Sequence, residues 1–131
     1  MERKTVVMLV LCRRVIADLL IKTVGIQPDM EVHGVYDFQN AGNEAMLYQP
    51  QLALLEIPEK QGFPALDTLA ICKEIRKESP GCKIVLLCPE QDKESVDVCI
   101  DVKKRGEIED FLFYDNSMDY LASKLKALCP A

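Results

Sequence analysis

Five short runs of apolar residues recur along the chain, and each is followed by a stretch whose apolar residues repeat at helical spacing. The runs are Thr5–Leu11, Glu31–Tyr36, Leu52–Ile57, Lys83–Cys88 and Ile108–Tyr114, of which Glu31–Tyr36 is the weakest. Runs that are apolar throughout, rather than at every second position, are typical of strands buried on both faces of a parallel sheet. We therefore expect five buried strands.

The intervening stretches predict helices. The expected helices cover Arg14–Val24, Phe38–Tyr48, Ala65–Glu78 and Asp92–Val102, and a last helix is capped by Ser117 or Asn116. Breaks are expected at Gly25, at Pro50, in the loop Pro58–Pro64, at Ser79–Gly81 and at Pro89. The apolar residues expected on the inner helix faces are Val15, Ile16, Leu19, Leu20, Val24, Ala41, Ala45, Tyr48, Leu66, Leu69, Ala70, Cys72, Ile75, Val96, Cys99, Ile100, Leu121, Leu125 and Leu128.

Regular alternation of strands and helices predicts an α/β fold with a parallel sheet, helices on both of its faces and right-handed crossovers. The 131 residues suit a single domain spanning 1–131. Hydrophobic residues make up 49% of the chain and aromatic residues only 6%, so we expect an aliphatic core.

Charge and cysteine content narrow the class of protein. The 21 acidic residues outnumber the 16 basic ones, which disfavours nucleic-acid binding by this domain. A local basic patch could use Arg13, Arg14, Lys103, Lys104 and Arg105, but solvated helix ends are the favoured interpretation. The six cysteines form no C-x-x-C pair, and we expect reduced thiols in a cytoplasmic protein with no signal peptide, membrane span or zinc site.

In an open parallel sheet, ligands bind at the carboxyl ends of the strands. After the first strand the residues Leu11–Arg14 contain no glycine, which excludes the usual dinucleotide fingerprint and phosphate-binding loops. The only histidine, His33, falls inside a predicted strand, and a half-buried structural role is the favoured interpretation.

Three segments resemble the receiver domain of two-component response regulators. P-Q-L-A-L-L-E-I (Pro50–Ile57) is similar to the family's P-D-L-V-L-L-D-I, Lys73–Leu87 matches closely, and Val15–Leu20 matches more loosely. The resemblance extends from Thr5 to Leu128. It implies a flavodoxin-like, doubly wound (βα)5 fold, with a five-stranded parallel sheet in the strand order 2-1-3-4-5.

The resemblance also implies five functional positions, and all five have changed. The acidic pair that helps to hold Mg²⁺ falls on Leu11 and Cys12, the phospho-acceptor aspartate on Glu56, the hydroxyl residue on Cys88 and the lysine on Tyr114. Leucine and cysteine are not hard oxygen ligands, so we expect no Mg²⁺ and no other cofactor. Phosphoryl transfer needs a metal to neutralise spreading charge. The chain is therefore interpreted as a pseudo-receiver without catalytic residues.

Two roles remain open for Glu56. Its longer side chain could place negative charge near the position of a phosphoryl group and so mimic the phosphorylated state. Alternatively, hydrogen bonds, including one from the Tyr114 hydroxyl, could hold it in a purely structural role.

The resemblance further implies an interaction surface formed by the fourth helix, the fifth strand and the fifth helix, where a protein partner or a second copy would bind. Phe111, Phe113 and Tyr114 lie in this strand, and core packing is the alternative for some of them.

Three hypotheses of function follow. The first is a signalling module, not controlled by phosphorylation, that acts by protein–protein contact in a phosphorelay-type pathway. The second is the N-terminal regulatory domain of a longer DNA-binding regulator. The third is a small-molecule or redox sensor that uses the crevice, with Cys12 and Cys88, or with Glu56, Glu59, Glu90 and Asp115. A direct Cys12–Cys88 disulfide is disfavoured because a central strand should separate the two residues.

Overall fold

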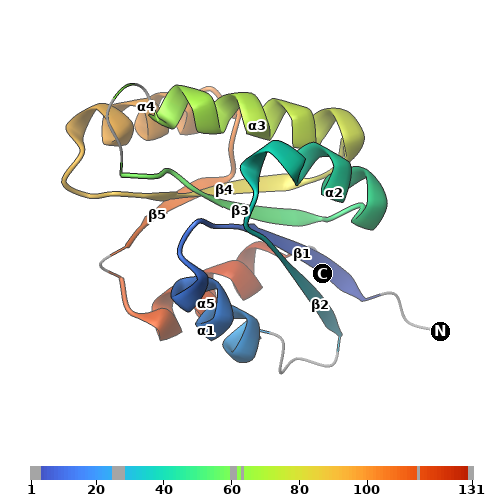
Figure 1. The fold of residues 1–131 in the computed structure, drawn as a ribbon. Helices are drawn as coiled ribbons and strands as arrows, with labels where there is room; N and C mark the ends of the chain where they lie inside the picture. The colour runs from blue at the N-terminus through green and yellow to red at the C-terminus, as the bar shows by residue number, and fades with distance from the viewer. Residues whose placement is uncertain (1–3, 25–28, 60–61, 63, 115, 130–131) are drawn as a thin grey trace.

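The apolar runs form one parallel sheet in the computed structural model, which describes residues 4–24, 29–59, 62, 64–114 and 116–129 (Figure 1). Its strands are β1 (Thr5–Val10), β2 (Met30–Val35), β3 (Leu52–Glu56), β4 (Lys83–Cys88) and β5 (Asp110–Phe113). Their spatial order is β2-β1-β3-β4-β5, and every neighbouring pair is parallel. The predicted fold class and strand order are confirmed.

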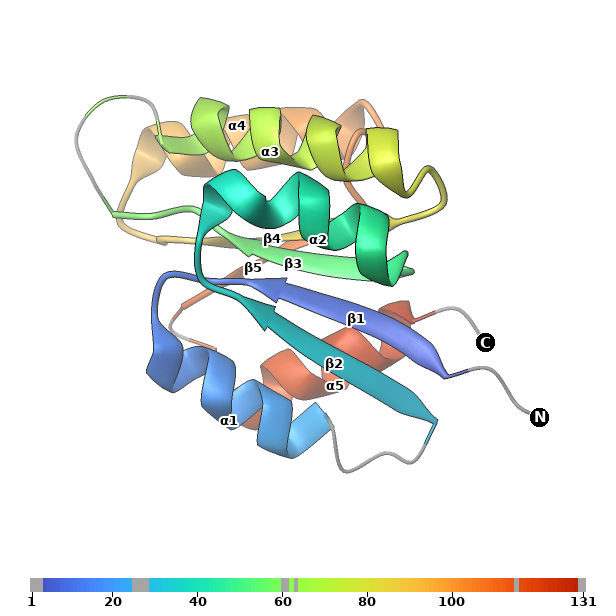
Figure 2. The same ribbon diagram turned by 45° about the vertical axis from the view of Figure 1, so that its right-hand side comes forward.

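Helices cover both faces of the sheet (Figures 1 and 2). One face carries α1 (Arg14–Val24) and α5 (Met118–Leu128), and the other carries α2 (Ala41–Tyr48), α3 (Pro64–Glu78) and α4 (Lys93–Lys104). A short 3-10 turn, η1 (Phe38–Asn40), precedes α2. The buried apolar side chains accordingly form two core clusters, one on each side of the sheet.

Local signals set the ends of several helices. The Ser117 hydroxyl accepts a hydrogen bond from the Tyr120 N–H, so Ser117 is the cap of α5. Asp92 caps α4 in the same way, and Pro64 begins α3, where its missing N–H costs nothing. The sequence had suggested that Pro64 is the end of a loop, but it is the first residue of a helix. The predicted stop at Gly25 lies outside the described residues.

The inner face of α3 differs from the prediction. Leu66 is 55% exposed and Ala70 is also exposed, whereas Ala65, Thr68 and Cys72 pack against the sheet. Thr68 can be buried because its hydroxyl donates to the Pro64 carbonyl oxygen at 2.9 Å. The small residues let the helix lie close to the strands, and this rotates the Leu66 side of α3 away from them.

Other outer positions also differ from the prediction. In α1, Val15 and Leu19 are 72% and 45% exposed, whereas Leu20 and Val24 face the sheet as predicted, together with Ala17, which was not predicted. In α4, Ile100 is 40% exposed. Each of these helices therefore has apolar residues that face solvent as well as apolar residues that pack against the sheet.

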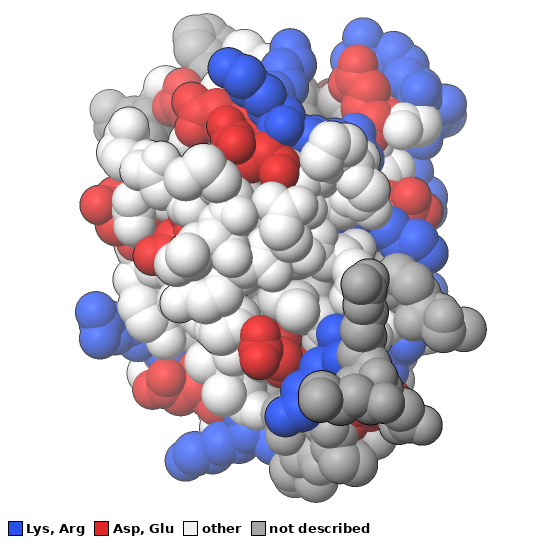
Figure 3. All heavy atoms as spheres, turned by 90° about the vertical axis from the view of Figure 1, so that its right-hand side faces the viewer, with Lys and Arg blue, Asp and Glu red and all other residues white. Residues whose placement is uncertain are grey.

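The edge strand β2 carries His33, which is half-buried as predicted. Its ring stacks on Tyr48 at a centroid distance of 3.8 Å, and its Nε2 lies 2.9 Å from Glu31 Oε2. Figure 3 shows the face of the molecule that lies on the right-hand side of Figure 1, and the centre of this face lacks Lys, Arg, Asp and Glu. Within the residues that the structure describes, none of the helices is long and apolar enough to span a bilayer.

Candidate functional site

Glu56 is the last residue of β3, between β1 and β4, at the edge where the carboxyl ends of the strands meet. Its side chain is completely buried. A carboxylate removed from water loses its hydration and needs donors from the protein. The geometry around Glu56 supplies them from two other loops.

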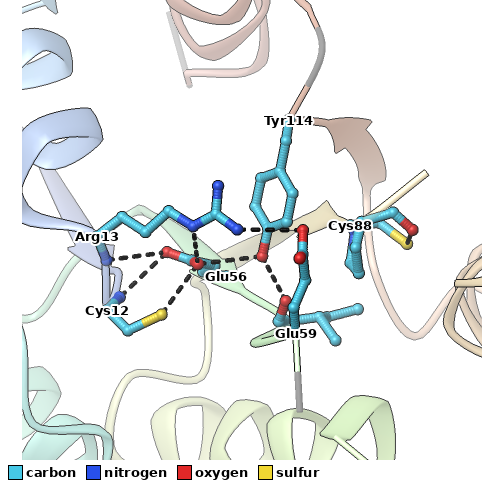
Figure 4. Close-up of polar contacts among 8 residues, drawn as sticks. Cys12, Arg13, Glu56, Glu59, Cys88 and Tyr114 are labelled. Carbon is cyan, nitrogen blue, oxygen red and sulfur yellow. Dashed lines mark hydrogen bonds and ion pairs between the residues drawn. The ribbon is translucent and has the colours of Figure 1, made fainter. Parts of the chain in front are cut away.

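Four donors surround the two carboxylate oxygens (Figure 4). The backbone N–H groups of Cys12 and Arg13 point to Glu56 Oε1 at 3.1 and 3.3 Å. The Cys12 thiol and the Tyr114 hydroxyl point to Oε2 at 2.9 and 3.1 Å. The Tyr114 hydroxyl also lies in hydrogen-bond contact with the Ile57 carbonyl oxygen. The loops after β1, β3 and β5 are therefore joined through one carboxylate.

Arg13 adds a positive charge to this cluster. Its Nε lies 3.5 Å from Glu56 Oε2, and its Nη2 donates to Glu59 Oε1 at 3.1 Å. The guanidinium carbon lies 4.5 Å from the centroid of the Tyr114 ring. Arg13 thus lies over Glu56 and Tyr114 and links them to the loop after β3 (Figure 4). We call Cys12, Arg13, Glu56 and Tyr114 the Glu56 cluster.

The buried carboxylate changes the acidity of its neighbours. Burial, together with the hydrogen bond and negative charge of Glu56, raises the pKa of the Cys12 thiol to about 11. Burial and the Glu56 charge also raise the pKa of the Tyr114 hydroxyl. Both groups therefore remain protonated at neutral pH and act as donors to Glu56.

Leu11 and Cys88, the other two positions implied by the resemblance, do not contact this carboxylate. The Leu11 side chain packs in the core cluster under α1 and α5. Cys88 is buried in the opposite cluster, and its thiol donates to the Pro89 carbonyl oxygen at 3.6 Å. Figure 4 shows Cys88 apart from the residues that bind Glu56. Cys12 and Cys88 therefore contact different groups.

The aromatic residues of β5 and of the position after it divide between the two sides of the sheet. Phe111 and Phe113 are half-buried against the cluster under α2, α3 and α4, and their rings meet edge-on at 5.7 Å. Tyr114 turns to the other side and reaches Glu56. Phe111 and Phe113 thus pack partly in the core, and Tyr114 binds Glu56.

Three of the basic residues considered as a patch are engaged separately. Arg14 lies over the Tyr36 ring at 4.3 Å, Lys103 binds Asp110 at 2.9 Å, and Arg105 binds Asp101 at 3.0 Å. Such contacts suit solvated helix ends.

Of the acidic residues considered for a sensor, Glu56 and Glu59 both bind Arg13. Asp115 lies outside the described residues. No group of three or more His, Cys, Asp or Glu side chains suited to a metal occurs in the described part of the chain.

Sequence reasoning missed Arg13 as part of the site. The family pattern places functional residues at Leu11 and Cys12, and Arg13 is the next residue. A long cationic side chain beside two altered acidic positions is a signal that could have identified it, because a buried carboxylate needs a compensating charge.

Comparison with known proteins gives matches only among solved structures; no family model and no curated protein matches the chain. A signal receiver domain of a putative Luxo repressor protein from Vibrio parahaemolyticus has a TM-score of 0.74 and 18% identity, over 95% of this chain and 88% of that one. The isolated REC domain of RcsB from Salmonella enterica serovar Typhimurium has a TM-score of 0.73 and 15% identity, over 96% and 88%.

A response regulator receiver domain protein (CheY-like) from Methanospirillum hungatei JF-1 has a TM-score of 0.73 and 14% identity, over 95% of this chain and 92% of that one. These structures share the strand order and the helix arrangement while sharing few residues. The chain therefore has the CheY-like receiver fold.

Proposed function

We propose that this chain is a receiver-like signalling module that takes no phosphoryl group and acts through protein–protein contact. One observation carries the proposal: both carboxylate oxygens of Glu56 already accept hydrogen bonds from Cys12, Arg13 and Tyr114. The acid that stands in place of the phospho-acceptor is used to hold the protein together.

Phosphorylation of Glu56 would require one carboxylate oxygen to attack phosphorus. In this arrangement each oxygen is occupied by donors from the chain itself, and the side chain is completely buried. Attack would first require these hydrogen bonds to break, and breaking several of them to one buried charge costs several kcal/mol in order of magnitude.

Metal binding is opposed by the same residues. Mg²⁺ requires oxygen ligands, whereas the side chain next to Glu56 in the loop after β1 is the thiol of Cys12. The Arg13 guanidinium, 3.5 Å from Glu56 Oε2, supplies positive charge where a cation would otherwise compensate the carboxylate. We infer that Arg13 acts as a fixed internal counter-ion.

The cluster favours a structural role for Glu56 over phosphomimicry. A mimic needs a serine or threonine and a lysine that sense the added charge, and Cys88 and Tyr114 occupy those two positions. Glu56 is bound instead by the Tyr114 hydroxyl, a thiol and two backbone N–H groups. These contacts tie the loops after β1, β3 and β5 in one arrangement. The module is thus held in a single state, and signalling would depend on partner binding.

The proposed interaction surface is formed by α4, β5 and α5. Asp110 of β5 binds Lys103 of α4 at 2.9 Å and lies 3.8 Å from Lys124 of α5, so one carboxylate bridges the two helices. Ile100 and Tyr120 are 40% and 44% exposed on these helices. Apolar residues around a fixed charged centre suit a protein partner in the cytoplasm.

The test is incubation of the full chain with acetyl phosphate and Mg²⁺, followed by intact mass measurement. A receiver domain that accepts phosphate from acetyl phosphate serves as the positive control. We expect no phosphoryl adduct on this chain. An adduct that is lost in Glu56→Gln would show that Glu56 is still an acceptor and would contradict the proposal.

A second candidate function is the regulatory domain of a longer DNA-binding regulator. It is favoured by the similarity to a structure titled "DNA-binding response regulator, LuxR family, from Staphylococcus aureus", with a TM-score of 0.71 and 14% identity. A reading frame that continues beyond Ala131 into a helix-turn-helix segment would support this candidate.

A further inference from the structure

Two cavities follow one another along the groove between α3 and α4. The first, about 290 Å³, lies at the amino ends of both helices, and the second, about 470 Å³, lies between α3 and the segment after α4. Leu66 lines both cavities, and it is 55% exposed. Val98 lines the first cavity, and Leu69 and Ala70 line the second. An apolar strip therefore runs along the groove on the side of α3 that the sheet does not use.

The two ends of the groove carry opposite charge. The first cavity is bordered by Asp92, Glu94 and Asp97, with no lysine or arginine in its lining. The second is bordered by Lys73, Arg76 and Arg105, with Glu107 as its one acid. We call these the acidic end and the basic end of the α3–α4 groove.

We propose that a second copy of this chain docks on the α3–α4 groove. A two-fold axis through the apolar centre, beside Leu66, reverses the direction of the groove in the partner. The acidic end of each copy then faces the basic end of the other, so the same complementary contact forms twice. Leu66 and the apolar strip lie at the centre, where water is excluded.

The charge pattern selects a second copy over other occupants. A basic peptide would satisfy Glu94 and Asp97 but would be repelled by Lys73 and Arg76 at the other end. An acidic peptide would meet the reverse problem. A partner must carry both charges in the right order, and the two-fold related groove does so by symmetry. This inference is independent of the proposed function, and its groove shares only α4 with the surface formed by α4, β5 and α5.

The first test is sedimentation equilibrium of the full chain over a range of concentrations. We expect a monomer–dimer equilibrium that weakens as salt screens the end charges. Leu66→Asp should raise the dissociation constant at least about tenfold, because it places a charge at the apolar centre. The matched control is Leu19→Asp, a comparably exposed leucine (45%) on α1, which should leave dimerisation unchanged.

A charge exchange provides the second test. The double variant Glu94→Lys/Asp97→Lys has two basic ends, and Lys73→Glu/Arg76→Glu has two acidic ends. Asp92 is kept because it caps α4, and Arg105 is kept because it binds Asp101 and Glu107 at 3.0 and 3.4 Å. Each variant alone should lose dimerisation, whereas a mixture of the two should form a heterodimer detectable by native mass spectrometry.

The heterodimer is a result that unfolding cannot produce, because it requires both variants to be folded. Three results would overturn the proposal: a wild-type chain that stays monomeric up to about 1 mM, a dimer unaffected by Leu66→Asp, or a mixture of the charge variants that remains monomeric. A dimer abolished by Ile100→Asp and not by Leu66→Asp would place the contact on the surface formed by α4, β5 and α5, and would likewise overturn it.

Discussion

The Glu56 cluster and the α3–α4 groove are built from the same kinds of side chain, yet they use them in opposite ways. At Glu56, the acid, the cation and the donors all come from one chain, and the cation and the donors lie within 3.5 Å of the carboxylate oxygens. In the groove, acids and cations collect at separate ends, on either side of an apolar strip. The first arrangement is complete within one molecule, and the second becomes complete only when another surface covers it.

Burial explains this difference. A carboxylate without water must be satisfied internally, because an unpaired buried charge costs several kcal/mol. Glu94 and Asp97 border an open groove and remain hydrated, so the fold does not require partners for them. The Glu56 cluster is therefore expected to control stability, and the groove is expected to control association.

Replacing Glu56 should have the largest effect on stability. Glu56→Ala leaves the Cys12 thiol and the backbone N–H groups of Cys12 and Arg13 without their acceptor, and it leaves Arg13 with Glu59 as its counter-charge. We expect the free energy of unfolding to fall by about 3 kcal/mol, the high end for leaving a buried donor without its acceptor, because several donors are affected. Urea denaturation followed by circular dichroism measures the change.

Two controls separate the buried charge from shape and from surface charge. Glu56→Gln keeps the side-chain length and one carbonyl acceptor, so it should cost less than Glu56→Ala. Glu59→Gln removes the other acid bound to Arg13, at 58% exposure of that side chain, and should cost less than about 1 kcal/mol. Equal losses in all three variants would contradict the central role of Glu56.

Removing one donor should have a smaller effect. Tyr114→Phe deletes the hydroxyl that contacts Glu56 and the Ile57 carbonyl oxygen but keeps the ring under Arg13. We expect a loss of about 1–2 kcal/mol, because two buried acceptors lose one donor. Tyr120→Phe is the matched control, since Tyr120 is 44% exposed on α5, and it should be close to neutral in the same denaturation experiment.

The sequence predicted the fold well, because the features that determine it are periodic. Apolar runs identified all five strands, and the break at Pro50 agrees with Gln49, which ends α2 in the left-handed region with φ of 49°. Strand order came from the resemblance, since periodicity identifies strands but does not order them. The prediction failed for the inner face of α3, where counting apolar residues selected Leu66 and Ala70.

The α3 error and the missed arginine share a physical cause: both depend on contacts between segments distant in sequence. The sheet packs against the side of α3 that carries Ala65, Thr68 and Cys72, and no property of α3 alone reveals that choice. Arg13 becomes part of the site because the loop after β1 lies against Glu56, 43 residues away along the chain. A local pattern contains neither fact.

The Glu56 cluster should also lower the reactivity of the Cys12 thiol. Cys12 is exposed, but burial of its sulfur and the nearby Glu56 raise its pKa to about 11 from 9.0. At pH 8 the thiolate fraction falls about 100-fold, and the greater nucleophilicity of a more basic thiolate recovers about tenfold. The folded chain should therefore react with a disulfide reagent roughly tenfold more slowly at Cys12 than the urea-unfolded chain.

Glu56→Gln tests the cause of this slow reaction. Removing the carboxylate should accelerate the reaction at Cys12 while leaving the rate at buried Cys72 unchanged, as measured by mass spectrometry of the labelled peptides. A rate at Cys12 that is equal in folded and unfolded chains would show that Glu56 does not hold the thiol.

The smallest expected effect concerns Asp110, a half-buried acid whose burial lies between that of Glu56 and that of the acids in the groove. Burial raises the pKa of Asp110, but the hydrogen bonds from Lys103 and the Phe111 N–H and the positive charge of Lys103 and Lys124 outweigh it, so the pKa lies below the ordinary value.

A lowered pKa means that the stabilisation is present above the unfolded pKa of about 3.9 and is lost as pH falls through the folded value. Asp110→Asn should therefore cost about 0.5 kcal/mol at pH 7 and progressively less toward pH 2, as the wild-type carboxyl becomes protonated. Urea denaturation at the two pH values measures this, with Asp119→Asn on α5 as the exposed control. A loss of the same size at pH 2 would mean that Asp110 acts through packing and that its charge does not bridge α4 and α5.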